Sequence, residues 1–149
     1  MTQAQAIEAI VEAWATGWAA RHPNDVPFTL TNEGFDSDGL TAWARLTVRH
    51  SLRQQITMGP PGTRRFENKG RIVVQLFGAV NVGDAPLATL CDDVRAVLES
   101  TQIVVAPNDY IKTFAGTPVD GTASANGAET DGRWAMKSVV IPFWYEEIG

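Results

Sequence analysis

The sequence predicts an α+β fold in which two helices pack on one face of a mostly antiparallel sheet that contains a long β-hairpin. Three features predict it: an apolar helical stripe opens the chain, a second occupies residues 87–99, and two segments of alternating polarity flank a turn. At 149 residues the chain has the length of one domain. We therefore expect a single domain over residues 1–149.

Residues 4–20 have the spacing of an amphipathic helix. Its apolar stripe consists of Ile7, Ile10, Val11, Trp14 and Trp18. Glu8 and Glu12 lie off this stripe, so we expect them to face solvent. The short β-rich segment 26–30 follows, and Pro27 restricts it to a sheet edge or a strand end.

Two alternating segments, 40–53 and 65–77, predict the long hairpin. Their even positions are mainly apolar, whereas most of their charged residues are odd. The Gly-Pro-Pro-Gly sequence between them is typical of a turn. If the residue numbers of each cross-strand pair sum to about 120, the apolar faces of both strands lie on the same side of the hairpin. This register places Arg53 opposite Glu67 and, unfavourably, Arg49 opposite Arg71. A register shift of two residues would separate the two arginines and keep the same faces.

The rest of the chain completes the sheet and adds the second helix. Asp84 is a candidate cap for this helix, whose apolar stripe contains Cys91 as a buried, inert thiol. Short strands are predicted at 103–106 and 110–114, and a last strand at 134–145. Residues 117–132 are rich in Gly, Ser, Thr, Ala and Asp, which predicts an exposed mobile loop.

Charge is distributed unevenly along the chain. Residues 45–71 hold seven basic residues and one acid, a net +6, which leaves −11 for the remainder of a chain whose total is −5. The basic residues are Arg45, Arg49, Arg53, Arg64, Arg65, Lys69 and Arg71. Such asymmetry favours contact with an acidic partner.

The sequence contains no recognisable catalytic, cofactor-binding or metal-binding motif. His22 and His50 are isolated from ligand-spaced partners, and the adjacent acids Glu146 and Glu147 diverge on a strand. The longest apolar run has seven residues, far below the roughly 20 that a membrane span needs, and no secretory signal is visible. We expect a protein that is not an enzyme, needs no cofactor and does not cross a membrane.

Several segments carry a resemblance to a known family. They are the Ala-rich first helix, the strand Ala42-Trp43-Ala44-Arg45-Leu46-Thr47-Val48, the strand Gly70-Arg71-Ile72-Val73-Val74-Gln75-Leu76-Phe77, the loop Val82-Gly83-Asp84, and Gly132-Arg133-Trp134-Ala135-Met136-Lys137-Ser138-Val139-Val140-Ile141-Pro142-Phe143. In this order they resemble the tail terminator, or tail completion, proteins of long-tailed bacteriophages. The resemblance covers nearly the whole chain.

The resemblance implies a structural role in the virion. Such a protein forms a ring with itself, typically of six subunits, which caps the tail tube, ends its polymerisation and supplies the surface that joins tail to head. The implied partners are the tail tube protein and a head–tail connector or neck protein, with DNA passing through the lumen. The implied location is the head-proximal end of the tail, after assembly in the host cytoplasm.

The seven cations and two tryptophans are the candidate contact residues. The cations could face an acidic protein, line a lumen that DNA crosses, or form an ordinary solvated strand face. Trp14 and Trp18 lie on the helical stripe and are expected in the core. Trp43 lies on the polar face of its strand and Trp144 near the C-terminus, so both are candidate interface anchors.

Two other functions are compatible with the sequence. A neck or head–tail connector protein of similar size would share the general build. A small cone-shaped isomerase-like or dehydratase-like enzyme would need a ligand pocket, for which His50 or Asp36 are the candidate residues.

Overall fold

The computed structural model describes residues 1–80, 82–120 and 134–149. Within these residues, two helices and seven strands form an α+β fold, which confirms the predicted class. In chain order the elements are α1 (Gln3–Arg21), β1 (Phe28–Leu30), β2 (Ala42–Gln55), β3 (Arg65–Ala79), α2 (Ala85–Leu98), β4 (Gln102–Ala106), β5 (Asp109–Thr113), β6 (Thr117–Asp120) and β7 (Trp134–Ile148).

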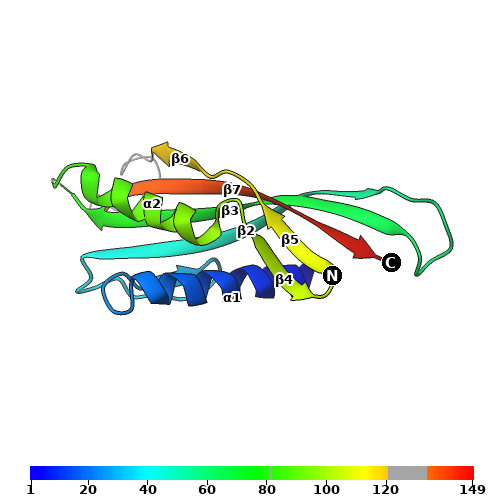
Figure 1. The fold of residues 1–149 in the computed structure, drawn as a ribbon. Coiled ribbons are helices and arrows are strands. Elements are labelled where there is room, and N and C mark those ends of the chain that lie inside the picture. Colours follow the sequence, from blue (N-terminus) through cyan, green and yellow to red (C-terminus); the bar gives the residue numbers. More distant parts are fainter. Residues whose placement is uncertain (81, 121–133) are drawn as a thin grey trace.

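The strands form one mixed, mostly antiparallel sheet. Their order is β1-β2-β3-β7-β5-β4, with β6 beside β7. β1 pairs with β2 in parallel and lies at a sheet edge, as Pro27 predicts. The long strands β2, β3 and β7 form the centre of the sheet, and their ends extend past both helices (Figure 1).

Both helices pack on the same face of this sheet. The pairs Ile72↔Ile141 and Val74↔Val139 place even positions of β3 and odd positions of β7 on one side. All four side chains are buried in the main core with the apolar stripes of α1 and α2. The two helices also touch each other where Gly17 of α1 faces Val97 of α2.

The apolar stripe of α1 supplies the largest buried side chains. Trp14 and Trp18 stack with ring centroids 4.6 Å apart, and both are essentially inaccessible, which confirms that they belong to the core. The Trp18 indole N–H donates to the backbone oxygen of Val26 at 2.9 Å. Thr2 and Gln5 form a capping box where the helix begins. Within the described residues, neither helix combines the length and apolar character of a membrane span.

The β2–β3 hairpin keeps the predicted register only up to Ser51. From Ala42↔Gly78 to His50↔Gly70 the paired numbers sum to 120, so Arg49 lies opposite Arg71. A bulge at Ser51 then shifts the pairing by one residue. The predicted pairing of Arg53 with Glu67 is therefore wrong, because Arg53 lies opposite Asn68.

Two local predictions need correction. The predicted loop at 117–132 begins instead as a strand, since Thr117–Asp120 forms β6 and pairs with β7, while the rest of that loop lies outside the described residues. Asp84 stands at the N-cap position of α2, but its side chain makes no capping hydrogen bond. Pro86 in the first turn removes one of the N–H groups that a cap would satisfy.

Gly70 lets the strands and side chains of the centre approach closely. A Cβ at this position would lie 2.2 Å from the backbone oxygen of Arg49 and 2.5 Å from the Phe143 ring. Because Gly70 has no side chain, His50 of β2 extends across β3 and hydrogen-bonds the Tyr145 hydroxyl of β7 at 2.8 Å. Glycine is required here for space, not for backbone conformation.

We predict that Gly70→Ala destabilises the chain by about 3 kcal/mol or more, because neither the backbone of Arg49 nor the packed Phe143 ring can move away freely. Urea unfolding followed by tryptophan fluorescence measures the change. Gly34→Ala is the control, because a Cβ at Gly34 meets nothing within 4 Å. Equal stability of the two variants would show that the centre of the sheet adapts to the extra methyl group.

Candidate interaction surface

The sheet face opposite the helices is not covered by a helix in the described part of the chain. We call it the open face. Its side chains come from odd positions of β3 from Glu67 to Phe77, even positions of β7 up to Trp144 and odd positions of β2 before the bulge, with Lys112 of β5 aligned beside Trp144. Its basic residues are Arg45, Arg49, Lys69, Arg71 and Lys112. Four of the seven predicted contact cations thus share one surface.

Arg49 and Arg71 form an uncompensated pair on the open face. They lie directly opposite each other on β2 and β3, and both are exposed. Neither makes an ion pair with a residue in the described ranges. Like charges in directly opposed positions destabilise a sheet. An anionic group placed between the two guanidinium groups would relieve this repulsion.

A shallow depression of about 790 Å³ adjoins this pair. Its lining includes four aromatic residues, three basic residues and one acid, namely Tyr110, Phe114, Phe143, Trp144, Lys69, Arg71, Lys112 and Glu67. They come from β3, β5, β7 and the residue after β5, so segments far apart in sequence form one site. Aromatic walls with basic residues suit a partner that presents apolar groups beside carboxylates or phosphates.

Trp144 is fixed in this depression by an acid. Its indole N–H donates to Glu67 at 2.9 Å, and Glu67 also pairs with Lys69 at 2.9 Å. The hydrogen bond from Lys69 holds the pKa of Glu67 below its usual value; burial opposes this effect, and the Lys69 charge and Trp144 support it. Trp144 is half-buried, so part of its ring lines the surface, as an anchor requires.

Trp43 does not lie on the accessible surface, and this part of the sequence prediction is wrong. Its side chain is only 3% exposed, stacked on Phe77 with centroids 4.0 Å apart. Trp134 and Met136 complete this second apolar cluster, and Leu40 packs against it. The assignment of Trp43 to the polar face of β2 was correct, but the loop before β2 covers that end of the face.

The remaining predicted cations lie near the hairpin tip and are separated by the bulge. Arg53 is moved to the helix side of the sheet, where its guanidinium lies 3.8 Å from the centre of the Phe66 ring and pairs with Glu147 at 3.2 Å. Arg65 pairs with Glu146 on the opposite side. Arg64 hydrogen-bonds the backbone oxygen of Gly59 at 2.9 Å and has no ion pair within the described chain.

Glu146 and Glu147 were recognised in the sequence as diverging, and the structure confirms it. Each neutralises a hairpin arginine on a different side of the sheet. Sequence reasoning missed this role because it did not pair β7 with β3. It also missed Lys112, which reaches the open face only because β5 joins β7.

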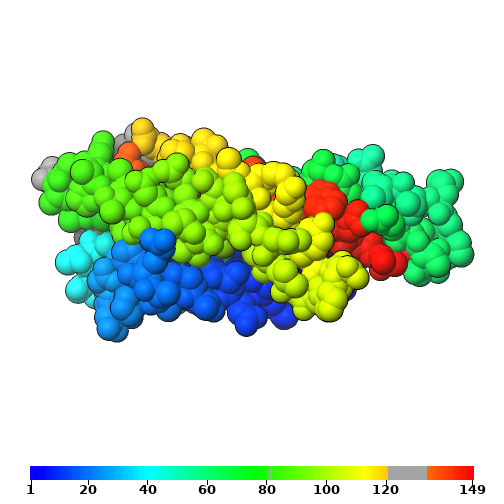
Figure 2. Space-filling view, viewed as in Figure 1, coloured from blue at the N-terminus to red at the C-terminus, as the bar shows by residue number. Residues whose placement is uncertain are grey.

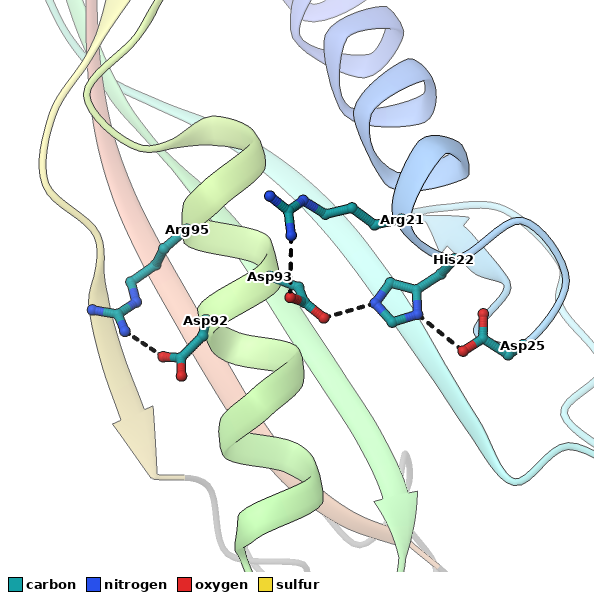
Figure 3. A network of polar contacts seen from close by, with 6 residues as sticks. All are labelled: Arg21, His22, Asp25, Asp92, Asp93 and Arg95. Carbon is teal, nitrogen blue, oxygen red and sulfur yellow. Dashed lines mark hydrogen bonds and ion pairs between the residues drawn. The ribbon is translucent and has the colours of Figure 1, made fainter.

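A second polar cluster joins the two helices. The His22 ring contacts Asp25 through Nδ1 at 3.0 Å and Asp93 of α2 through Nε2 at 2.8 Å, while Arg21 lies 3.4 Å from Asp93 (Figure 3). Burial lowers the pKa of His22, but the hydrogen bonds and charges of both carboxylates outweigh burial and raise the pKa above its ordinary value. The cluster holds the end of α1 against α2.

His50 has the opposite surroundings. It contacts Tyr145 and the edge of the Phe143 ring, and burial lowers the pKa of its imidazole while raising that of Tyr145 to about 12. The contacts of His50 do not include Asp36, the alternative residue suggested for an enzyme pocket. Among the described residues, no group of three or more His, Cys, Asp or Glu is arranged to hold a metal ion.

Cys91 is buried in the main core, as its place on the apolar stripe of α2 predicts. Burial raises the pKa of its thiol, and the nearby Lys137 acts in the opposite direction. The thiol is therefore poorly suited to act as a nucleophile.

Comparison with known proteins identifies a shared fold. No family model and no curated protein matches this chain. Among solved structures 22 chains are similar, and one of them, which carries no functional name, has a TM-score of 0.67 over all of this chain and 98% of its own length. Sequence identity to that protein is 15%, so the similarity extends to the fold alone.

We predict that Arg71→Glu stabilises the isolated chain by about 0.2–1 kcal/mol, because it converts a repulsive cross-strand pair with Arg49 into an attractive one. Urea unfolding of the monomer measures the effect. Arg65→Glu is the control and should destabilise the chain, since it places two acids together at Glu146. Reduced stability of Arg71→Glu would mean that Arg71 is already compensated in the free chain.

We predict that His22→Gln costs most stability between about pH 4 and 6.5. The pKa of His22 is raised in the folded chain. The stabilisation that His22 provides is therefore complete at pH values below its pKa in the unfolded chain, and it is lost as pH rises through its pKa in the folded chain. The hydrogen bond from His22 lowers the pKa of Asp25. The stabilisation that ionised Asp25 provides is therefore lost only as pH falls through this lowered pKa. Urea unfolding across this range measures the difference from wild type.

His50→Gln provides a control of opposite sign. The pKa of His50 is lowered on folding, so the stabilisation from its neutral ring is complete above the unfolded value and is lost as pH falls through the folded value. If the cost of His22→Gln instead grew between pH 6 and 8, the pKa shift of His22 would have the opposite direction.

Proposed function

We propose that this protein is a structural protein of a long-tailed bacteriophage, forming a ring that caps the tail tube, ends its polymerisation and provides the surface for joining the head. The observation that carries the proposal is the open face, on which an aromatic depression adjoins the uncompensated Arg49–Arg71 pair. A surface that is repulsive in the free chain and becomes compensated on contact suits an assembly protein. The sequence resemblance to tail terminators supplies the biological setting.

Charge polarity of the chain supports a terminating role. The open face is basic, whereas the exposed sides of the helices carry acids such as Glu8, Glu12 and Asp92. A terminator must bind the tube end and yet not offer the next tube subunit a copy of the surface just covered. Two faces of opposite charge meet this requirement, because charge complementarity fixes orientation as well as partner choice.

We propose that the open face meets an acidic protein surface at the tube end or in the neck. An acidic chain is a poor general binder of nucleic acid, which argues for a protein as the principal contact of these cations. The ring, with six subunits as the resemblance implies, would occupy the head-proximal end of the tail and leave its lumen open to DNA. No catalytic step is part of this function.

Replacement of the open-face pair tests the proposal. In the phage that encodes the chain, we expect Arg49→Gln with Arg71→Gln to yield tails of irregular length or tails without heads. The physical reason is the loss of two charged contacts to the partner, worth at least about tenfold in affinity. Electron microscopy of lysates measures tail length and head attachment.

Ala88→Glu with Ala96→Glu is the matched control, since it changes net charge by the same amount at exposed positions of α2. Control phage should assemble normally. If the arginine variant also assembles normally, the contact lies elsewhere on the chain. If deletion of the whole gene leaves tails of regular length joined to heads, the proposed function is wrong.

A further inference from the structure

The hairpin tip projects from the body as an arm with exposed apolar side chains. We call residues 52–66 the arm; it comprises the ends of β2 and β3 beyond the bulge and the turn between them, and it extends past the helices (Figures 1 and 2). Leu52, Ile56 and Met58 are 44%, 43% and 92% exposed. Apolar side chains gathered on a projecting segment are typical of a contact surface.

A groove on the helix side of the molecule has matching apolar character. It follows α1 where that helix meets β4 and has a volume of about 740 Å³. Val104 and Val105 of β4 are exposed in it at 65% and 43%, and the small residues Ala9 and Ala13 of α1 leave room beside them. In Figure 2 this junction lies between the blue and yellow-green surfaces.

The arm and the groove carry opposite charges. The arm contains Arg53, Arg64 and Arg65 and no acid. The groove is lined by Glu8 and Glu12, which make no ion pair with any residue in the described ranges. Arg53 and Arg65 stay half-exposed despite their pairs with Glu147 and Glu146. Arg64 makes no ion pair with the described part of the chain, so the arm can present positive charge.

We propose that the arm of one copy of the chain seats in the α1–β4 groove of a second copy. Ile56 and Met58 would pack on Val104 and Val105, and the arm arginines would meet Glu8 and Glu12. The inference rests on the proposed ring function and names the contact between its subunits. Apolar burial would supply the affinity of this contact, and the charges would set its orientation.

The occupant is a second copy because each chain carries both halves of the contact. The arm points away from the body, so it leaves its own groove open (Figure 1). An arm-to-groove contact uses two different surfaces and is therefore heterologous. Repetition of such a contact closes into a ring when the rotation between neighbours permits.

Two variants that each disable one half of the contact test this proposal. Met58→Asp alters the arm, and Val104→Asp alters the groove. Each alone should weaken association at least about 30-fold, as expected for an interface hot spot. Val119→Asp is the matched control, because Val119 is an exposed strand residue of β6 outside both surfaces, and it should associate like wild type. Sedimentation velocity over a concentration series measures association.

A mixture of the two variants gives the sharpest readout. The intact arm of Val104→Asp can enter the intact groove of Met58→Asp, so the mixture should form dimers and nothing larger. If Val104→Asp fails to fold, Glu12→Arg replaces it, since it reverses the groove charge at an exposed helix position. An effect of Met58→Asp without any effect of the groove variant would mean that arms pair with arms, which contradicts the proposal.

Two further outcomes would overturn this contact. One is association of both variants at wild-type strength; the other is a wild-type chain that stays monomeric at about 1 mM. Neither result bears on tail length, which the gene deletion tests separately. Conversely, dimers in the mixture together with normal tails after gene deletion would support the contact and refute the phage function.

Discussion

The pairing of β3 on both sides is the constraint on which the rest of the structure depends. β3 pairs with β2 on one side and with β7 on the other along nearly its whole length. Because strand side chains alternate, these two registers decide which residues face the helices and which form the open face. A slip of one residue would bury Arg71 under the helices and expose Ile72.

The bulge at Ser51 divides the hairpin into two parts with different roles. Before it, β2 contributes alternately to the core and to the open face. Beyond it, the alternation is reversed, and β2 leaves the cover of the helices. One inserted residue thus separates a basic sheet face from an arm whose charges are partly neutralised by the end of β7.

Much of the fold could be predicted from local patterns, because helix stripes and strand alternation are encoded locally. The apolar spacing around Trp14 predicted its burial, and the alternation of β2 and β3 predicted their register up to His50. The burial of Trp43 could not be predicted, since it depends on how the preceding loop folds over the sheet. The depression at Trp144 could not be predicted from the sequence either, because its lining residues come from strands that are far apart in the chain and adjacent only in the folded sheet.

The Arg49–Arg71 pair gives ionic strength opposite effects on the free and the assembled chain. Dissolved salt screens exposed charges, so it relieves the repulsion between these two guanidinium groups and stabilises the free protein. The same screening weakens attraction to an acidic partner. Both effects favour dissociation at high ionic strength and association at low ionic strength. Ionic strength alone therefore shifts the balance between the free and the assembled protein.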